Sequence, residues 1–142
     1  MRFWDSSAVV PLVCRERQSA SCRSWLRSDE VMIVWAFAAC EVISALARKR
    51  REGALDAHRY TVAKRRLGKL EESWTEVIQL DVVRSRARRL LETHPLRAAD
   101  GLHLAAALVA VEERTAGMEF VTFDQRLGEA AGKEGFSVLG TP

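Results

Sequence analysis

The feature that most constrains the fold is an alternation of short, continuously apolar segments with longer segments of helical spacing. The apolar segments are Arg2–Asp5, Val31–Val34, Val77–Leu80 and Phe120–Phe123, with Ser137–Leu139 as a candidate fifth. Strands that are apolar on both faces are typical of a parallel sheet covered by helices on both sides. The sequence therefore predicts an α/β fold with a central parallel sheet of four to five strands and helices on both faces.

Helices are predicted between these strands because apolar residues there recur every three or four positions. They cover residues 8–13, 18–27, 36–53, 55–72, 82–91, 96–113 and 125–131. Ser6 and Ser7 are typical helix-start residues, and Gly53 is typical of a helix end. Pro11 is expected in the first turn of its helix, where its missing N–H costs least.

The length and composition favour a single globular domain. The chain has 142 residues, of which 48% are hydrophobic and 29% charged, values that are ordinary for such a domain. It contains no internal repeat, low-complexity stretch or linker-like segment. We therefore expect one domain spanning residues 1–142.

The cysteines and the apolar runs bear on the compartment. Cys14, Cys22 and Cys40 are odd in number and show no C-x-x-C spacing, so we expect reduced core residues, which fit a reducing cytosol. No basic stretch leads into an apolar segment at the N-terminus, as a signal peptide would require. No apolar run approaches the ~20 residues of a membrane span. The expected location is cytoplasmic, away from membranes.

Two acidic residues follow predicted strands. Asp5 ends the first strand, and Asp124 comes directly after the fourth. Ligands of parallel α/β sheets bind beyond the carboxyl ends of the strands. If the first and fourth strands are neighbours, these carboxylates face each other across one crevice. Each could instead simply cap the helix that follows it.

Two further acids stand in apolar surroundings. Glu41 lies in the sequence WAFAACEVI and Asp100 in AADGLHLA, each near the start of a predicted helix. Each could be a favourable charge in a first helical turn. Burying an unpaired carboxylate is costly, however, so each calls for a basic partner or a cation. Four carboxylates that converge would repel one another unless a cation lay among them, and oxygen ligands favour magnesium or manganese.

The segments around these four acids resemble the motifs of the PIN-domain nucleases, and in particular the VapC-type toxins of prokaryotic type II toxin–antitoxin systems. The segments are FWDSSAVV at residues 3–10, CEVISAL at 40–46, LRAADGLHLA at 96–105 and VTFDQRL at 121–127. The resemblance covers nearly the whole chain. One departure is Gly101, where the family more often has alanine.

The resemblance implies a PIN-like fold and a magnesium- or manganese-dependent endoribonuclease that hydrolyses RNA through a metal-activated water held by the four carboxylates. It also implies a toxin that forms a homodimer and is inhibited by a cognate antitoxin. Whether one or two metal ions are used stays open.

The mechanism assigns roles to the motif residues. Asp5, Asp100 and Asp124 are the expected metal ligands, and Glu41 is a ligand or the residue that orients and deprotonates the attacking water. Ser6 and Thr122 are expected to hydrogen-bond these carboxylates and fix their positions.

Histidines and tryptophans offer weaker candidates. His103, three residues after Asp100, is expected to pack or to position a neighbour rather than to act as a general base. His94 is expected at the surface, as is His58. Trp4 and Trp35 are expected in the core, although either could stack on a base.

Basic residues cluster at Arg48–Arg51, Lys64–Lys69 and Arg84–Arg89. Such runs usually form solvated helix faces, but basic patches that flank an acidic site also attract a polyanion. Arg97, close to Asp100, is the best single candidate for a phosphate contact.

Three other interpretations compete with this one. A phosphorylation-receiver domain would need an acidic neighbour beside Asp5 and a lysine after the last strand, and the sequence has neither. A non-cleaving PIN-like module could bind RNA or a protein partner. An RNA-processing nuclease would share the same site without a toxin role.

Overall fold

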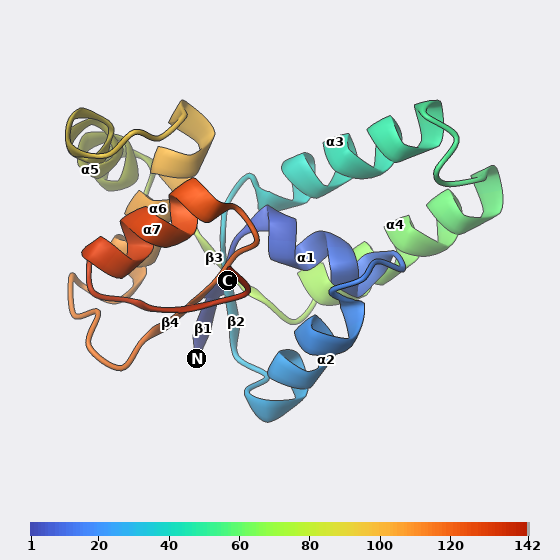
Figure 1. Ribbon diagram of the computed structural model, residues 1–142, viewed down its shortest axis with the longest axis horizontal. Coiled ribbons are helices and arrows are strands. Elements are labelled where there is room, and N and C mark those ends of the chain that lie inside the picture. The colour runs from blue at the N-terminus through green and yellow to red at the C-terminus, as the bar shows by residue number, and fades with distance from the viewer. Residues whose placement is uncertain (142) are drawn as a thin grey trace.

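The centre of the fold is a five-stranded parallel sheet (Figure 1). The computed structural model describes residues 1–141. The strands are β1 (Arg2–Trp4), β2 (Met32–Trp35), β3 (Thr75–Val77), β4 (Glu119–Val121) and β5 (Ser137–Leu139). They lie in the order β3-β2-β1-β4-β5. The predicted α/β class is confirmed, and Ser137–Leu139 is a strand with the predicted bounds.

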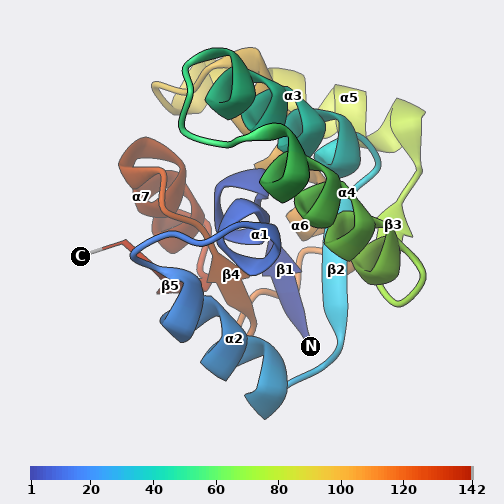
Figure 2. The ribbon, with the colours of Figure 1, turned by 90° about the vertical axis from the view of Figure 1, so that its right-hand side faces the viewer.

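Helices cover both faces of this sheet. They are α1 (Ser6–Val13), α2 (Ser19–Ser28), α3 (Ala38–Arg51), α4 (Ala57–Glu71), α5 (Leu80–Thr93), α6 (Ala98–Ala110) and α7 (Gln125–Lys133). One face packs against α1 to α4 and the other against α5 to α7, on the right and left of Figure 1. Figure 2 shows the molecule from the side of α1 to α4. No helix among residues 1–141 is both long enough and apolar enough to cross a membrane.

The strands contribute residues alternately to two cores. In β1, Phe3 packs with the α5–α7 layer and Trp4 with the α1–α4 layer. In β2, Ile33 packs with the α5–α7 layer and Val34 with the α1–α4 layer. This is the period-two alternation of a strand that is buried on both faces. Trp4 and Trp35 are buried, as expected from the sequence.

The third strand and the first helix differ from the prediction. The third strand ends at Val77, and Leu80 already begins α5. The strand lies at the edge of the sheet, and Ile78 and Leu80 are 66% and 46% exposed, so their apolar character does not reflect burial. Pro11 lies in the second turn of α1, because that helix already starts at Ser6.

Two side-chain expectations are also wrong. Cys40 is exposed, because the buried face of α3 carries Ala38, Val42 and Leu46, and Cys40 falls on the opposite side. His94 is not a surface residue, because only 8% of its side chain is exposed and it hydrogen-bonds Glu134.

Candidate functional site

The two strand-end acids lie on neighbouring strands. Strands β1 and β4 pair in parallel, and the Asp5 N–H donates to the Val121 carbonyl at 3.0 Å. Asp5 caps α1, and Asp124 caps α7 by accepting from the Leu127 N–H at 2.8 Å. The condition that the sequence left open, adjacency of the first and fourth strands, is therefore met. Both acids therefore cap a helix and also face the site described below.

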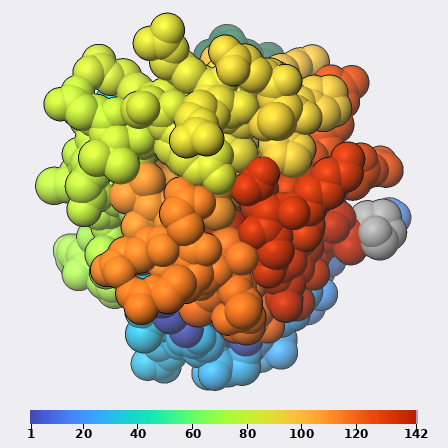
Figure 3. Space-filling view, turned by 90° about the vertical axis from the view of Figure 1, so that its left-hand side faces the viewer, coloured from blue at the N-terminus to red at the C-terminus, as the bar shows by residue number. Residues whose placement is uncertain are grey.

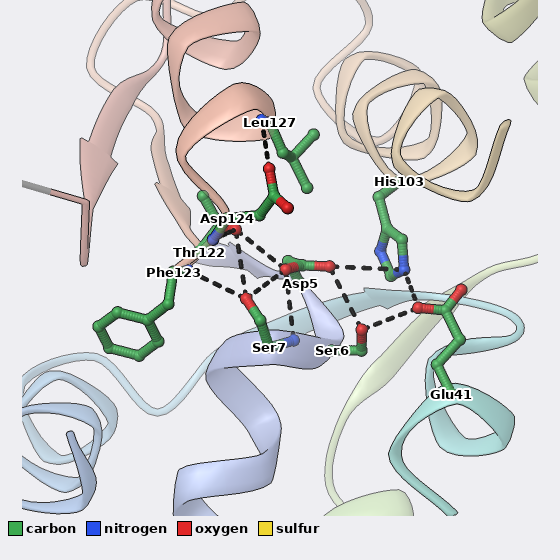
Figure 4. A network of polar contacts seen from close by, with 9 residues as sticks. All are labelled: Asp5, Ser6, Ser7, Glu41, His103, Thr122, Phe123, Asp124 and Leu127. Atoms are coloured by element: carbon green, nitrogen blue, oxygen red, sulfur yellow. Dashed lines mark hydrogen bonds and ion pairs between the residues drawn. The ribbon is translucent and has the colours of Figure 1, made fainter. Parts of the chain in front are cut away.

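The carboxylate of Asp5 is held on one side only (Figure 4). Its Oδ2 accepts hydrogen bonds from the Thr122 hydroxyl at 2.9 Å, the Ser7 N–H at 3.3 Å and the Ser7 hydroxyl. Its Oδ1 has only longer contacts, 3.4 Å to Ser6 Oγ and 3.5 Å to His103 Nε2. Asp5 is 4% exposed, so Oδ1 is a buried oxygen with spare capacity for a ligand.

Ser7 is a site residue that the sequence analysis missed. Besides donating to Asp5, its hydroxyl accepts from the Phe123 N–H at 3.0 Å and lies 3.3 Å from Thr122 Oγ1. It thus ties the start of α1 to the segment after β4 (Figure 4). The available signal was the serine pair after Asp5, but the sequence does not say which serine contacts which carboxylate.

Glu41 and His103 form the other half of the network. Glu41 lies in the first turn of α3, and its Oε2 accepts from Ser6 Oγ and His103 Nε2, both at 2.8 Å. Its Oε1 accepts no hydrogen bond from the described residues. Burial raises the pKa of Glu41, but the hydrogen bond and charge of His103 and the hydrogen bond of Ser6 lower it by more. Glu41 is therefore ionised at neutral pH, with one oxygen fixed and one free.

His103 is buried between two carboxylates. It is 1% exposed, and its Nδ1 has no hydrogen-bond partner within residues 1–141. Burial lowers the pKa of His103, but the hydrogen bond to Glu41 and the charges of Asp5, Glu41 and Asp100 raise it by more. Because Nε2 must carry a proton to donate to Glu41, His103 holds that carboxylate in place, which agrees with the positioning role favoured from the sequence.

Asp100 interacts electrostatically with the other aspartates. It is half-buried in the first turn of α6. Burial raises the pKa of Asp100, and the charges of Asp124 and Asp5 raise it further. The charge of His103 lowers this pKa by less, so the repulsion among the carboxylates is only partly offset.

The residues fit a divalent cation. One ligand atom each from Asp5, Glu41 and His103 lies within 4.8 Å of the others, whereas Asp100 and Asp124 lie outside this tight group. Nε2 of His103 is already engaged with Glu41, so the available donors are carboxylate oxygens. An all-oxygen set, including the under-used Oδ1 of Asp5, suits magnesium or manganese better than zinc.

A pocket of about 900 Å³ opens above these acids. Its lining includes Glu41, Asp100 and Asp124, together with four basic residues. The basic residues are Arg48, Lys49, Arg97 and Arg126. Arg97 was singled out from the sequence and Arg126 was not. Neither the 64–69 cluster nor the 84–89 cluster lines the pocket.

The glycine that departs from the family pattern has a local explanation. A Cβ at Gly101 would lie 2.8 Å from Leu91 Cδ2. An alanine at this position would therefore require the Leu91 side chain of α5 to shift.

The sequence matches the PIN domain family over residues 2–133, and the chain therefore belongs to the PIN domain family. It is 31% identical to Ribonuclease VapC46 of Mycobacterium tuberculosis (strain ATCC 25618 / H37Rv), over 96% of this chain and 95% of that relative. These similarities confirm the resemblance drawn from the four motifs.

Solved structures show the same fold. FitAcB from Neisseria gonorrhoeae has a TM-score of 0.66 at 17% identity, covering 97% of this chain and 96% of that one. PAE2754 from Pyrobaculum aerophilum has a TM-score of 0.64 at 22% identity, covering 96% and 89%. FitAB bound to an IR36 DNA fragment has a TM-score of 0.64 at 17% identity, covering 98% and 94%.

Proposed function

We propose that this protein is a magnesium- or manganese-dependent endoribonuclease and the toxin of a toxin–antitoxin pair. The observation that carries the proposal is the gathering of Glu41, Asp100 and Asp124 at one pocket, beside the buried Asp5. Among the described residues, His103 is the only basic residue that forms an ion pair with any of these four acids. Other acids of the fold, such as Glu134, pair with arginine. An uncompensated carboxylate cluster in a pocket is what a cation site requires.

Asp5, Asp100 and Asp124 would hold the cation, with Glu41 as a further ligand or as the residue that orients water. A divalent ion in such a site supplies an activated water and neutralises charge on the attacked phosphate. Support for Asp5 as a ligand comes from its Oδ1, which is buried and only weakly contacted.

The protein's own groups prepare the reaction. Ser6 and His103 fix one oxygen of Glu41, so its free Oε1 is placed to accept a hydrogen bond from the attacking water. Ser7 and Thr122 hold Asp5 from the opposite side. Arg97, at the pocket wall, is suited to bind a phosphate oxygen of the substrate.

RNA as substrate and the toxin role rest on similarity. The relative is named a ribonuclease, and its alignment covers nearly both chains. By the same reasoning we propose a cognate antitoxin, a homodimer and a cytoplasmic location. The alternative, a PIN-like module that binds RNA or protein without cutting, would retain the fold and lack the reaction.

Cleavage of bulk RNA tests the proposal. The wild-type protein should cut RNA with Mg²⁺ or Mn²⁺ and stop on addition of EDTA, and Asp5→Asn should lower the rate at least about a hundredfold. Asp81→Asn, which removes an exposed acid in the first turn of α5, is the matched control and should cut normally.

Two results would overturn the proposal. Equal cutting by wild type and Asp5→Asn would show that another site or a contaminant is responsible. Binding of RNA by wild type without any metal-dependent cutting would favour the non-cleaving module.

A further inference from the structure

Helices α3 and α4 project from the sheet as an arm, and a turn at the tip of this arm joins the two helices (Figure 1). Between residues 48 and 69 the arm carries nine Lys and Arg residues against two acidic ones, a local net charge of +7 in a chain whose net charge is +3. The rest of the chain is therefore net negative. The arm concentrates the positive charge that the overall composition conceals.

Most of this charge has no internal partner. Lys49 pairs with Glu16 and Arg59 with Asp56, while Arg66 donates to the Val13 carbonyl at 3.3 Å. The other cations of the arm form no ion pair with any carboxylate of residues 1–141. They are Arg48, Arg50, Arg51, Lys64, Arg65 and Lys69.

Two of these cations are held side by side on one aromatic ring. Arg50, from α3, lies 5.1 Å from the centroid of Tyr60, and Lys64, from α4, lies 4.9 Å from the same centroid. Cation–π contacts hold each group in place, but two like charges at one ring repel each other. A shared anion would relieve that repulsion, and phosphate is the anion that such a pair suits.

The arm continues into the pocket, whereas the other basic helix does not. Arg48 and Lys49, in the last turn of α3, line the pocket that holds the acids. On α5, Arg84 pairs with Asp81, and Arg86 pairs with Glu113 and Glu134. No residue of α5 lines the pocket. Two of the three basic clusters in the sequence thus meet on one surface that leads to the acids.

We propose that the α3–α4 arm binds the phosphate backbone of structured RNA beyond the pocket, with Arg50 and Lys64 at the centre of the contact. This inference rests on the proposed function and names the class of substrate: an RNA with a double-stranded part next to its cleavage site. Tyr60 is the only Phe, Trp or Tyr between residues 38 and 71, and its ring already contacts two cations. Surfaces that bind single strands usually offer free aromatic rings for stacking, whereas duplex RNA is bound mainly through backbone and shape.

Binding of two RNA probes tests the arm. Fluorescence anisotropy is measured with Asp5→Asn protein, so that the RNA stays intact, on a short RNA hairpin and on a single strand of about eight nucleotides. Adding Arg50→Gln and Lys64→Gln should weaken hairpin binding about tenfold and lower the slope of log Kd against log salt by about two. Binding of the short strand should change less than about twofold, because it fills only the pocket.

Two control variants make the outcome decisive. Arg88→Gln with Arg89→Gln removes the same charge from exposed positions on α5 and should leave hairpin binding nearly unchanged. Arg50→Lys with Lys64→Arg keeps the charge and should restore binding. Unchanged hairpin affinity and salt slope, or an equal loss in the α5 control, would overturn the proposal, and so would an arm variant that loses only antitoxin binding. Failure of the wild type to cut any RNA would instead overturn the proposed nuclease, and the binding comparison would still stand by itself.

Discussion

Two clusters of ionisable side chains lie at opposite ends of α6 and α7, and they are built on opposite principles. The site cluster (Asp5, Glu41, Asp100, Asp124 and His103) lies at the N-terminal ends of these helices. The back cluster (Arg86, His94, Glu113 and Glu134) lies at their C-terminal ends. Figure 3 shows the face of the molecule where α5, in yellow, meets the orange and red segments that include the end of α6 and α7.

In the back cluster every carboxylate has a basic partner. Arg86 donates to Glu113 at 3.0 and 3.2 Å and to Glu134 at 3.2 Å, and His94 Nε2 lies 2.7 Å from the other oxygen of Glu134. The site cluster has four carboxylates and one histidine. The back cluster thus stabilises the fold, whereas the site cluster keeps like charges together at a cost that a bound cation would offset.

The largest expected effect is on activity in the site cluster. Asp124→Asn should lower the cleavage rate more than about a hundredfold while changing the free energy of unfolding by less than about 0.5 kcal/mol. Asparagine caps a helix as well as aspartate does, so only the charge is lost. Initial rates and urea titrations measure the two quantities, and Asp124→Ala, which also loses the cap, should be about 1 kcal/mol less stable. Normal cleavage by Asp124→Asn would remove it from the site.

Ser7→Ala should have an intermediate effect. It removes the hydroxyl that donates to Asp5 and accepts from Phe123, so we expect a loss in cleavage rate of about 10- to 100-fold. Ser44→Ala is the control, because Ser44 lines the same pocket and makes no side-chain hydrogen bond with the described residues. Equal rates for the two variants would show that Ser7 does not position Asp5.

In the back cluster the same kind of change should affect stability and spare activity. Arg86→Leu leaves Glu113 and Glu134 without their partner, and we expect the free energy of unfolding to fall by about 2 kcal/mol. Urea denaturation measures the loss, and Arg88→Leu, exposed on the same helix, should change it by less than about 0.5 kcal/mol. A drop in cleavage as deep as that of Asp124→Asn would break the distinction between the two clusters.

The smallest effect is a pH-dependent gain in stability. The pKa of Asp100 is raised above its ordinary value of 3.8 in the folded protein. Between the unfolded and folded pKa values the folded state therefore binds more protons than the unfolded state, and the protein loses stability as pH rises through this range. Asp100→Asn should therefore be more stable than wild type at about pH 7 in EDTA, with the gain vanishing as pH falls below about 4. Thermal denaturation across this range measures it. A neutral-pH loss, or a gain independent of pH, would contradict the raised pKa of Asp100 that burial and the neighbouring aspartates cause.

The class of fold and the four acids of the site could be predicted from the sequence, each from a different feature. Asp5 and Asp124 were placed by strand ends, and Glu41 and Asp100 by apolar neighbours in which a lone acid is costly. The sequence could not show that β1 and β4 are neighbours, because the order of strands in a sheet depends on contacts between distant segments. The third strand is predicted at Val77–Leu80 but lies at Thr75–Val77, because exposed apolar residues at the sheet edge resemble buried ones in the sequence.

The contacts between segments that are far apart along the chain could not be predicted from the sequence. Ser7 hydrogen-bonds Phe123, which lies 116 positions further along the chain, and Arg86 hydrogen-bonds Glu134, which lies 48 positions further. Nothing in the local pattern distinguishes Arg86, which is paired, from Arg50, which is not. Only the fold shows that Arg84 and Arg86 of one basic run pair with acids, while Arg48 and Lys49 of another line the pocket.

Titration of Mn²⁺ into the metal-free protein, with free ion followed by electron paramagnetic resonance, tests most directly whether the uncompensated acids form a cation site. Wild type and Arg86→Leu should bind Mn²⁺ saturably with similar affinity, and Asp5→Asn should bind at least about tenfold more weakly. Equal binding by wild type and Asp5→Asn, or no saturable binding by wild type, would contradict the account.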